Sequence, residues 1–341
     1  MSYGRLGQVV IGIAVLAAAI GAGLWWNPIE EGKQHTGAEL AADGSCHPQL
    51  NAGEYPGMAF IEGATYSMGA NYAYPEEGPL HTATVGSFWI DQTEVTNAQF
   101  AEFITATGYV TLAERGISNP EDPAQAPIPG SAIFKPPYGP NGQPDPFGSW
   151  WVFMPGADWR HPQGPDSSIA GLEQHPVVHI AFEDAQAYAK WKGRSLATEE
   201  QFEYAALTSA RTDKQGKQTA NTWQGLFPFE LSSTDGFDAS APVGCYTPNA
   251  KGLYDMVGNV WEWTASPYYE SHDFPYKDKF PEGYDSNQPT DEVAVIKGGS
   301  YLCAPNYCMR YRPEARQGQS KGLGTIHIGF RTVLNDSPAQ N

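Results

Sequence analysis

The hydrophobic and polar positions divide the chain into an apolar N-terminal run, a short polar stretch and a long mixed region. Residues 6–26 carry no charge, and a helix needs roughly 20 apolar residues to cross a bilayer. Arg5 precedes this run and an acidic pair follows it, which favours an N-terminus that stays in the cytoplasm. We expect residues 1–27 to anchor the chain in the cytoplasmic membrane, with a cleaved signal peptide as the alternative. Residues 28–52 then form a linker, and residues 53–341 form one domain in the periplasm or extracytoplasmic space.

Helical periodicity is sparse in the exported region, and three stretches carry it. Residues 91–108 include a capping box, formed by Thr96 and Gln99, and end at a glycine. A second helix is expected at 182–192, and a third begins at another capping box, at Thr198. The sequence after this third helix predicts no strong helix.

The remaining pattern predicts short strands and long loops. Residues 58–69 predict a β-hairpin that turns near Glu62 and Gly63, and residues 81–89 predict a further strand. Residues 114–150 are rich in Pro and Gly and predict a long irregular excursion over the surface.

Two cysteines near the C-terminus combine this strand pattern with candidate chemistry. Residues 307–312 alternate, so that Cys308, Arg310 and Arg312 share one side of a predicted strand. Cys303 precedes it in a predicted turn. Neighbouring positive charge favours the thiolate, which is the form that binds metal or attacks. A local disulfide between the two cysteines is the alternative.

Composition and charge narrow the class of protein. The 20 basic and 38 acidic residues give a net charge of -18, which repels a phosphate backbone and argues against nucleic acid as a partner. The 37 glycines, 28 prolines and many aromatic residues favour a loop-rich fold over a helical bundle. Export permits disulfides, and four cysteines allow three pairings. If Cys303 and Cys308 are functional, Cys46 and Cys245 are left as the natural bridge.

Several blocks carry a family resemblance that covers nearly everything after Met58. They include IDQTEVTNAQF, GADWRHPQGPDSS, GLYDMVGNVWEWT and GGSYLCAPNYCMRYRPEAR. The chain resembles the formylglycine-generating enzymes, also called sulfatase-modifying factors, and the cysteine pair is typical of their oxygen-dependent branch. The resemblance implies an α+β fold: a single domain like that of the C-type lectins, with little regular secondary structure and calcium for support.

The resemblance also implies an enzyme activity. Such an enzyme oxidises the cysteine of a Cys-x-Pro-x-Arg motif in an unfolded sulfatase to Cα-formylglycine, with O2 and Cu(I). Two thiolates without imidazole form a soft ligand set, which selects Cu(I). Carried over to this chain, Cys303 and Cys308 bind copper, Ser300 lines the oxygen pocket and Trp261 forms a wall of the cavity. The family usually has a histidine directly after the first cysteine, and this chain has Ala304.

Two loops match the calcium-binding loops of the family. A hard cation prefers such mixtures of carboxylate, amide and backbone oxygens. The implied ligands of the first site are Asn221, Thr222, Asp235 and Phe237; those of the second are Asp255, Gly258, Val260 and Glu262. Thr222, Phe237, Gly258 and Val260 contribute backbone carbonyls, and Asp255 replaces the commoner asparagine. Ordinary acidic loops are the alternative.

Two other functions are compatible with the same residues. One is a related oxidase that acts on another exported peptide or on a siderophore precursor. The other is a non-catalytic, calcium-supported binding module whose cysteines form a disulfide. We expect the sulfatase chain, O2 and the membrane as partners of a monomeric protein. His175 and His179 flank an apolar pair and are interpreted as structural residues.

Overall fold

A computed structural model describes residues 46, 48–117, 126–138, 143, 145, 149–275 and 277–335. The predicted anchor and most of the predicted linker lie outside these residues. Within them, no helix is long and apolar enough to span a membrane. Helices and strands are both short, as the α+β expectation required.

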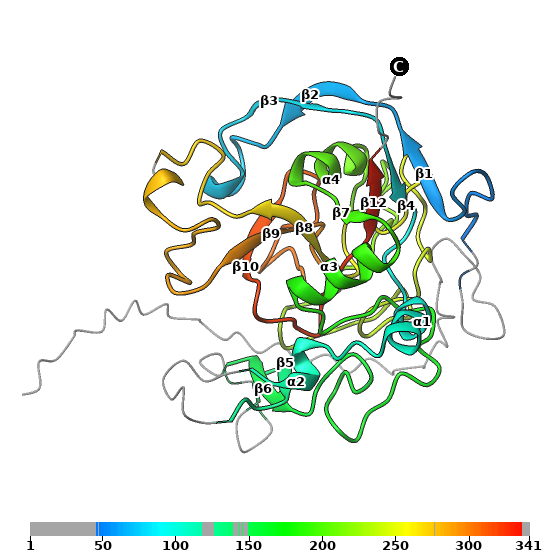
Figure 1. Ribbon diagram of the computed structural model, residues 1–341, viewed down its shortest axis with the longest axis vertical. Coiled ribbons are helices and arrows are strands. Elements are labelled where there is room, and N and C mark those ends of the chain that lie inside the picture. The colour runs from blue at the N-terminus through cyan, green and yellow to red at the C-terminus, as the bar shows by residue number, and fades with distance from the viewer. Residues whose placement is uncertain are drawn as a thin grey trace, which may run out of the picture. The chain divides into compact units, whose positions relative to one another are not determined.

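The first sheet joins the start of the described region to its end (Figure 1). Its strand order is β1-β4-β12-β7. The strands are β1 (Met58–Ile61), β4 (Phe88–Asp91), β12 (Thr332–Asn335) and β7 (Ser195–Leu196). Val333 of β12 lies opposite Ile90 of β4, and both side chains are fully buried.

The second sheet positions the cysteine segment. Its order is β10-β9-β8-β11, and β11 runs parallel to β8. The strands are β8 (Trp261–Pro267), β9 (Val293–Lys297), β10 (Arg316–Ser320) and β11 (Ile328–Gly329). Every residue of β9 is buried. The segment with both cysteines therefore leaves the sheet at the end of a central strand and returns to it at β10.

The helices agree closely with the sequence pattern. They are α1 (Asn97–Thr107), α2 (Leu112–Arg115), α3 (Phe182–Trp191) and α4 (Glu199–Ala206), with short 3-10 turns η1 (Pro75–Glu77) and η2 (Lys277–Lys279). The capping boxes at Thr96 and Thr198 are both formed, and Gly108 ends α1 in the left-handed conformation. In the described residues after Ala206, η2 is the helical element, which agrees with the prediction of no strong helix there.

The predicted hairpin at 58–69 is wrong. β1 pairs with β4, and β2 (Ala64–Met68) pairs with β3 (His81–Val85), so residues 58–68 form one interrupted arm against residues 81–91. The predicted strand at 81–89 is likewise two strands. The interruptions contact each other, since Gly63 donates its N–H to the Ser87 hydroxyl at 3.0 Å. Gly63 thus marks a close approach of two backbones and not a hairpin turn. The chain turns back only after residue 68.

The irregular excursion contains a further hairpin. β5 (Gly130–Phe134) pairs with β6 (Trp151–Pro155), and part of the segment between them lies outside the described residues. This hairpin brings aromatic side chains toward the cysteine segment. Phe134 contacts both Trp223 and Phe227, with ring centroids 5.8 and 5.5 Å apart.

The main core is aromatic and ends at the cysteine pair. Phe100 and Phe103 of α1 pack with Tyr188 of α3, and Phe330 completes the group. Trp261, Trp263, Cys303 and Cys308 belong to the same buried cluster. Aromatic packing of this kind contributes stability beyond area burial.

Cys46 and Cys245 form a disulfide, as expected if the other two cysteines are functional. The bridge joins residues 199 positions apart and packs against Ala241 and Tyr246. Cys303 and Cys308 are both free and buried.

Candidate active site

Two adjacent glycines direct the chain from β9 into the cysteine segment. Gly298 and Gly299 have φ values of 92° and 77°, which side chains rarely tolerate. A Cβ at Gly299 would lie 2.6 Å from the carbonyl oxygen of Arg310. The backbone on both sides of the cysteine pair can therefore approach closely.

Residues 307–312 do not form a strand, contrary to the prediction. Cys303 donates its N–H to the Ser300 carbonyl at 2.9 Å, and Cys308 donates to the Ala304 carbonyl at 3.1 Å. These turns curl the segment, so that the two Sγ atoms lie 2.8 Å apart. The alternating pattern predicted the wrong structure here, because local turns and side-chain ion pairs hold the backbone in another conformation.

The two thiols differ in acidity. The hydrogen bond from Cys303, together with nearby Arg310, lowers the pKa of Cys308 to about 7 although burial opposes this. Burial and the neighbouring sulfur raise the pKa of Cys303. Cys308 is therefore the more acidic of the two thiols.

Ion pairs fix the segment to η1. Arg312 binds Glu77 through two hydrogen bonds, and Arg310 binds Glu76 at 2.5 Å. The Arg310 guanidinium also stacks over the Tyr74 ring, 3.8 Å from its centroid. Arg310 therefore lies beside Cys308, as predicted, whereas Arg312 turns away to a buried carboxylate.

All four predicted catalytic residues line one cavity of about 380 Å³. Cys303, Cys308, Ser300 and Trp261 meet there, and the Ser300 hydroxyl accepts a hydrogen bond from the Leu302 N–H at 3.2 Å. The cavity has room for a substrate sulfur beside the two cysteine sulfurs.

The sequence did not reveal most of the other walls. They are aromatic and amide side chains from distant segments: Trp150, Trp151, Phe227, Tyr307, Gln288, Gln317, Gln319 and His327. Phe227 stacks on Tyr307 with ring centroids 4.4 Å apart. Burial lowers the pKa of His327 to about 3, so this imidazole is neutral. The aromatic run near residue 150 could have pointed to a wall of the cavity, but its residues follow neither a helical nor a strand period.

Ala304 is fully buried in an aromatic cluster. It packs with Trp223, Phe227, Tyr301 and Leu302. Where the resemblance implies a histidine, this chain therefore has a small apolar side chain that is buried behind the residues that line the cavity. Burial lowers the pKa of both His175 and His179 to about 4.

The Asp235 and Asn221 side chains of the first predicted calcium loop already have hydrogen-bond partners. Asp235 accepts from the Phe237 N–H at 3.1 Å and from the Tyr246 hydroxyl at 2.7 Å. The Asn221 side-chain amide donates to the Ala239 carbonyl at 2.9 Å. Across the described part of the chain, no three His, Cys, Asp or Glu side chains gather as a metal site.

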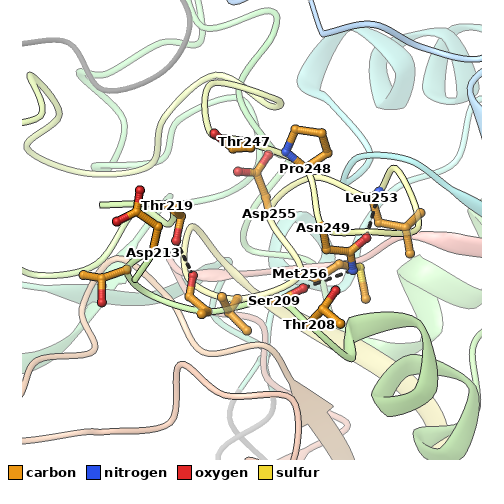
Figure 2. A pocket seen from close by; sticks show the side chains of 13 residues that line it. Thr208, Ser209, Asp213, Thr219, Thr247, Pro248, Asn249, Leu253, Asp255 and Met256 are labelled. Atoms are coloured by element: carbon orange, nitrogen blue, oxygen red, sulfur yellow. Dashed lines mark hydrogen bonds between the residues drawn. The ribbon is translucent and has the colours of Figure 1, made fainter. Parts of the chain in front are cut away.

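The two carboxylates of the second predicted calcium loop differ in how fully their oxygens are hydrogen-bonded. Both oxygens of Glu262 accept hydrogen bonds from Arg331, at 2.7 and 2.8 Å. Asp255 accepts one from the Gly244 N–H at 2.7 Å, and its Oδ1 atom is buried without a partner among the described residues. Burial raises the pKa of Asp255 to about 6. Asp255 also lines a small polar cavity beside Thr247 (Figure 2).

Comparisons with known proteins agree with this geometry. The model of the sulfatase-modifying factor enzyme 1-like domain matches residues 45–336. The formylglycine-generating enzyme of Mycobacterium tuberculosis is 45% identical over 293 residues, which cover 81% of this chain and 96% of the relative. The mouse formylglycine-generating enzyme is 33% identical and covers 96% of this chain and 89% of its own.

Two further comparisons concern a relative that is named as inactive and a solved structure. The mouse inactive Cα-formylglycine-generating enzyme 2 is also 33% identical, over 83% of this chain and 87% of its own. The structure of PvdO from Pseudomonas aeruginosa has a TM-score of 0.52 at 24% identity, over 81% of this chain and 93% of that one. This structure supports the fold alone. The match of the family model and the identity to its curated members together establish that the chain belongs to the formylglycine-generating enzymes, the sulfatase-modifying factor family.

Proposed function

We propose that this protein oxidises the cysteine of a Cys-x-Pro-x-Arg motif in unfolded sulfatases to Cα-formylglycine, using O2 and Cu(I). The observation that supports it most is the pair of buried sulfurs, 2.8 Å apart, at the wall of the cavity. The thiolate character of Cys308 and the soft donor set fit Cu(I). Cys303 and Cys308 are the residues that would hold the metal, and their two sulfurs face each other at 2.8 Å.

Copper, when bound by Cys303 and Cys308, would supply the redox chemistry that activates O2 toward an unactivated thiol. The chain's own residues bind the substrate. Trp261 and the stacked pair of Phe227 and Tyr307 give the cavity aromatic walls that an apolar part of a substrate can contact. Arg310 places positive charge beside the position where a substrate thiolate would enter.

The overall reaction needs a co-substrate that donates electrons. Conversion of CH2–SH to an aldehyde with release of sulfide is a two-electron oxidation, whereas O2 accepts four electrons on reduction to water. A thiol reductant must therefore supply two electrons and two protons. The test is to incubate the full-length chain with Cu(I), O2, a thiol and a Cys-x-Pro-x-Arg peptide, and to detect the aldehyde by mass spectrometry. Absence of aldehyde with a confirmed copper-loaded protein would contradict the proposal.

A second candidate is oxidation of a different exported peptide or of a siderophore precursor. Ala304 favours it, because the residue directly after Cys303 has no imidazole, which the resemblance implies at this position. If sulfatases are the substrates, a sulfatase peptide should be converted by the parent chain. If they are not, an Ala304→His variant should gain activity on that peptide.

The proposed setting is the outer face of the cytoplasmic membrane, with residues 1–27 as the anchor. The disulfide between Cys46 and Cys245 is consistent with an oxidising compartment. Calcium is proposed as a structural ion, since Asp255 has a buried oxygen without a partner among the described residues.

A further inference from the structure

The strand β10 forms one edge of the second sheet and pairs with β9 on its inner side (Figure 1). In an antiparallel pair, alternate residues direct their N–H and C=O groups away from the partner strand. Gly318 and Ser320 are two such residues of β10, because their backbone groups bond to a side chain outside the sheet. An open edge of this kind can pair with the backbone of another chain.

The side chain at this edge is that of Gln288, in the loop between β8 and β9. Its Nε2 atom donates to the Gly318 carbonyl at 3.3 Å, and its Oε1 atom accepts from the Ser320 N–H at 3.0 Å. Nε2 also donates to Asp285 Oδ2 at 2.9 Å, so two acceptors and one donor fix the orientation of the amide. A side-chain amide offers the donor and the acceptor of a peptide group. Gln288 therefore occupies the edge in the way that a further strand would.

The edge borders the candidate active site. Gln288 lines the cavity that contains the sulfurs of Cys303 and Cys308, and so do Gln317 and Gln319 of β10. Residues two apart in a strand share a face, so Gln317 and Gln319 form one wall together. A peptide that pairs with β10 therefore runs along this wall and stays in the same space as the two sulfurs.

We propose that the edge of β10 binds the backbone of the substrate polypeptide as an added strand, and that Gln288 holds the edge until the substrate displaces it. This rests on the function proposed above, because the occupant is the exported chain that carries the Cys-x-Pro-x-Arg motif. One substrate residue makes both bonds when its N–H reaches the Gly318 carbonyl and its own carbonyl accepts from the Ser320 N–H, as in a parallel pair. The Ser320 carbonyl already accepts from the Leu323 N–H at 3.2 Å, which keeps the pairing short.

The exchange of Gln288 for substrate requires little free energy. Two hydrogen bonds are replaced by two of the same kind, so the edge is satisfied with and without substrate. The bond to Gly318 is long and therefore weak. The loop keeps its other contacts, because Asp285 Oδ1 also accepts from the backbone N–H and the side-chain amide of Asn287.

Recognition through the backbone also selects the state of the substrate. Strand addition gives affinity through main-chain hydrogen bonds, which an extended segment can form. In a folded protein those groups are already paired within the fold. The edge of β10 thus accounts for a preference for unfolded sulfatase chains.

The first test measures binding, so it needs neither copper nor O2. A fluorescent peptide with serine in place of the motif cysteine is titrated into the full-length chain. Analogues carry an N-methyl group at each non-proline residue of the motif in turn. Methylation of the residue that pairs with β10 should weaken binding by about tenfold, because the N–H that reaches Gly318 is lost.

The second test removes the amide that occupies the edge. Gln288→Ala should bind the peptide about threefold to tenfold more tightly than the parent, because two hydrogen bonds no longer have to break. Asn287→Ala is the matched control. The Asn287 side chain donates to the same Asp285 carboxylate at 2.9 Å and has no bond to β10 among the described residues. Its affinity should equal that of the parent.

The third test follows the Ser320 N–H itself. In Gln288→Ala this group should exchange with deuterium rapidly in the free chain and slowly when the peptide is bound. Ser320→Pro removes the N–H at an edge position where proline is tolerated, and should weaken peptide binding by about tenfold. If Ser320→Pro does not fold, the exchange measurement decides the point.

The inference is overturned if the peptide does not bind, if methylation weakens binding at no position, or if Gln288→Ala and Asn287→Ala bind equally well. These results are distinct from failure of the proposed reaction. Aldehyde formation together with equal affinities of the two variants would refute the edge and leave the reaction standing. Binding that depends on the backbone, without any aldehyde from the copper-loaded chain, would support the edge and refute the reaction.

Discussion

Arg312 forms a bidentate ion pair with Glu77, with N···O distances of 2.6 and 2.9 Å across a sequence separation of 235 residues. Glu77 is fully buried in η1. Arg310 and Glu76 form a parallel pair beside it, and the Tyr74 hydroxyl accepts from the Met309 N–H at 3.3 Å. The position of Cys308 therefore depends on a segment from the opposite end of the domain.

Glu77→Gln should loosen the cysteine segment. A hydrogen bond to a charged group contributes about 1.5–3 kcal/mol, and the variant leaves Arg312 without its anion. We expect a loss of stability in that range and weaker Cu(I) binding. Glu183→Gln is the control, because its pair with Arg115 is about half exposed and should contribute about 0–1 kcal/mol. Urea unfolding and competition with a Cu(I) chelator measure both; equal effects of the two variants would argue against the role of η1.

Cys303→Ser and Cys308→Ser should each abolish Cu(I) binding and turnover with the fold unchanged. Both sulfurs lie at the cavity wall, and a hydroxyl is a poor ligand for a soft ion. Chelator competition measures Cu(I) binding, circular dichroism reports the fold, and the aldehyde assay measures turnover. Full activity of either variant would remove the copper assignment.

Reduction of the Cys46–Cys245 bridge should lower stability. The chain-entropy estimate for a loop of this length is about 5 kcal/mol, and measured losses are usually about 2–5 kcal/mol. The Cys46→Ser chain should therefore melt well below the parent. Non-reducing peptide mapping of the parent should show Cys46 joined to Cys245, and a link from either one to Cys303 or Cys308 would refute the assignment.

Acid should destabilise the protein in part through His179. Burial lowers the pKa of this side chain to about 4, below the usual 6.5. The unfolded chain thus binds a proton between pH 6.5 and 4 while the native chain does not, so stability is present above pH 6.5 and is lost as the pH falls. One histidine contributes up to about 1.36 kcal/mol per pH unit. His179→Gln should reduce the slope of unfolding free energy against pH by one proton, whereas His161→Gln, with a side chain 40% exposed, serves as the control. An unchanged slope in the first variant would contradict this account.

Local signals in the sequence determined the helices and the cysteine pair. A capping box at Thr96 or Thr198 depends on four neighbouring residues, and a glycine at 108 ends a helix whatever packs nearby. The pairing of Cys46 with Cys245 followed because the other two cysteines belong to a recognisable motif. These features could be predicted because the interactions that form them are close in the chain.

Only the tertiary structure decided the register of the long β-arm, the walls of the cavity and the use of the acidic residues. The local sequence predicted a turn at Gly63, whereas its contact with Ser87 shows that this residue lies inside the β-arm. Phe227 and Tyr307 stack across 80 residues, and Arg331 takes the Glu262 carboxylate. Each outcome is a choice among distant partners. That choice is set by burial and charge balance in three dimensions, which no local pattern of residues encodes.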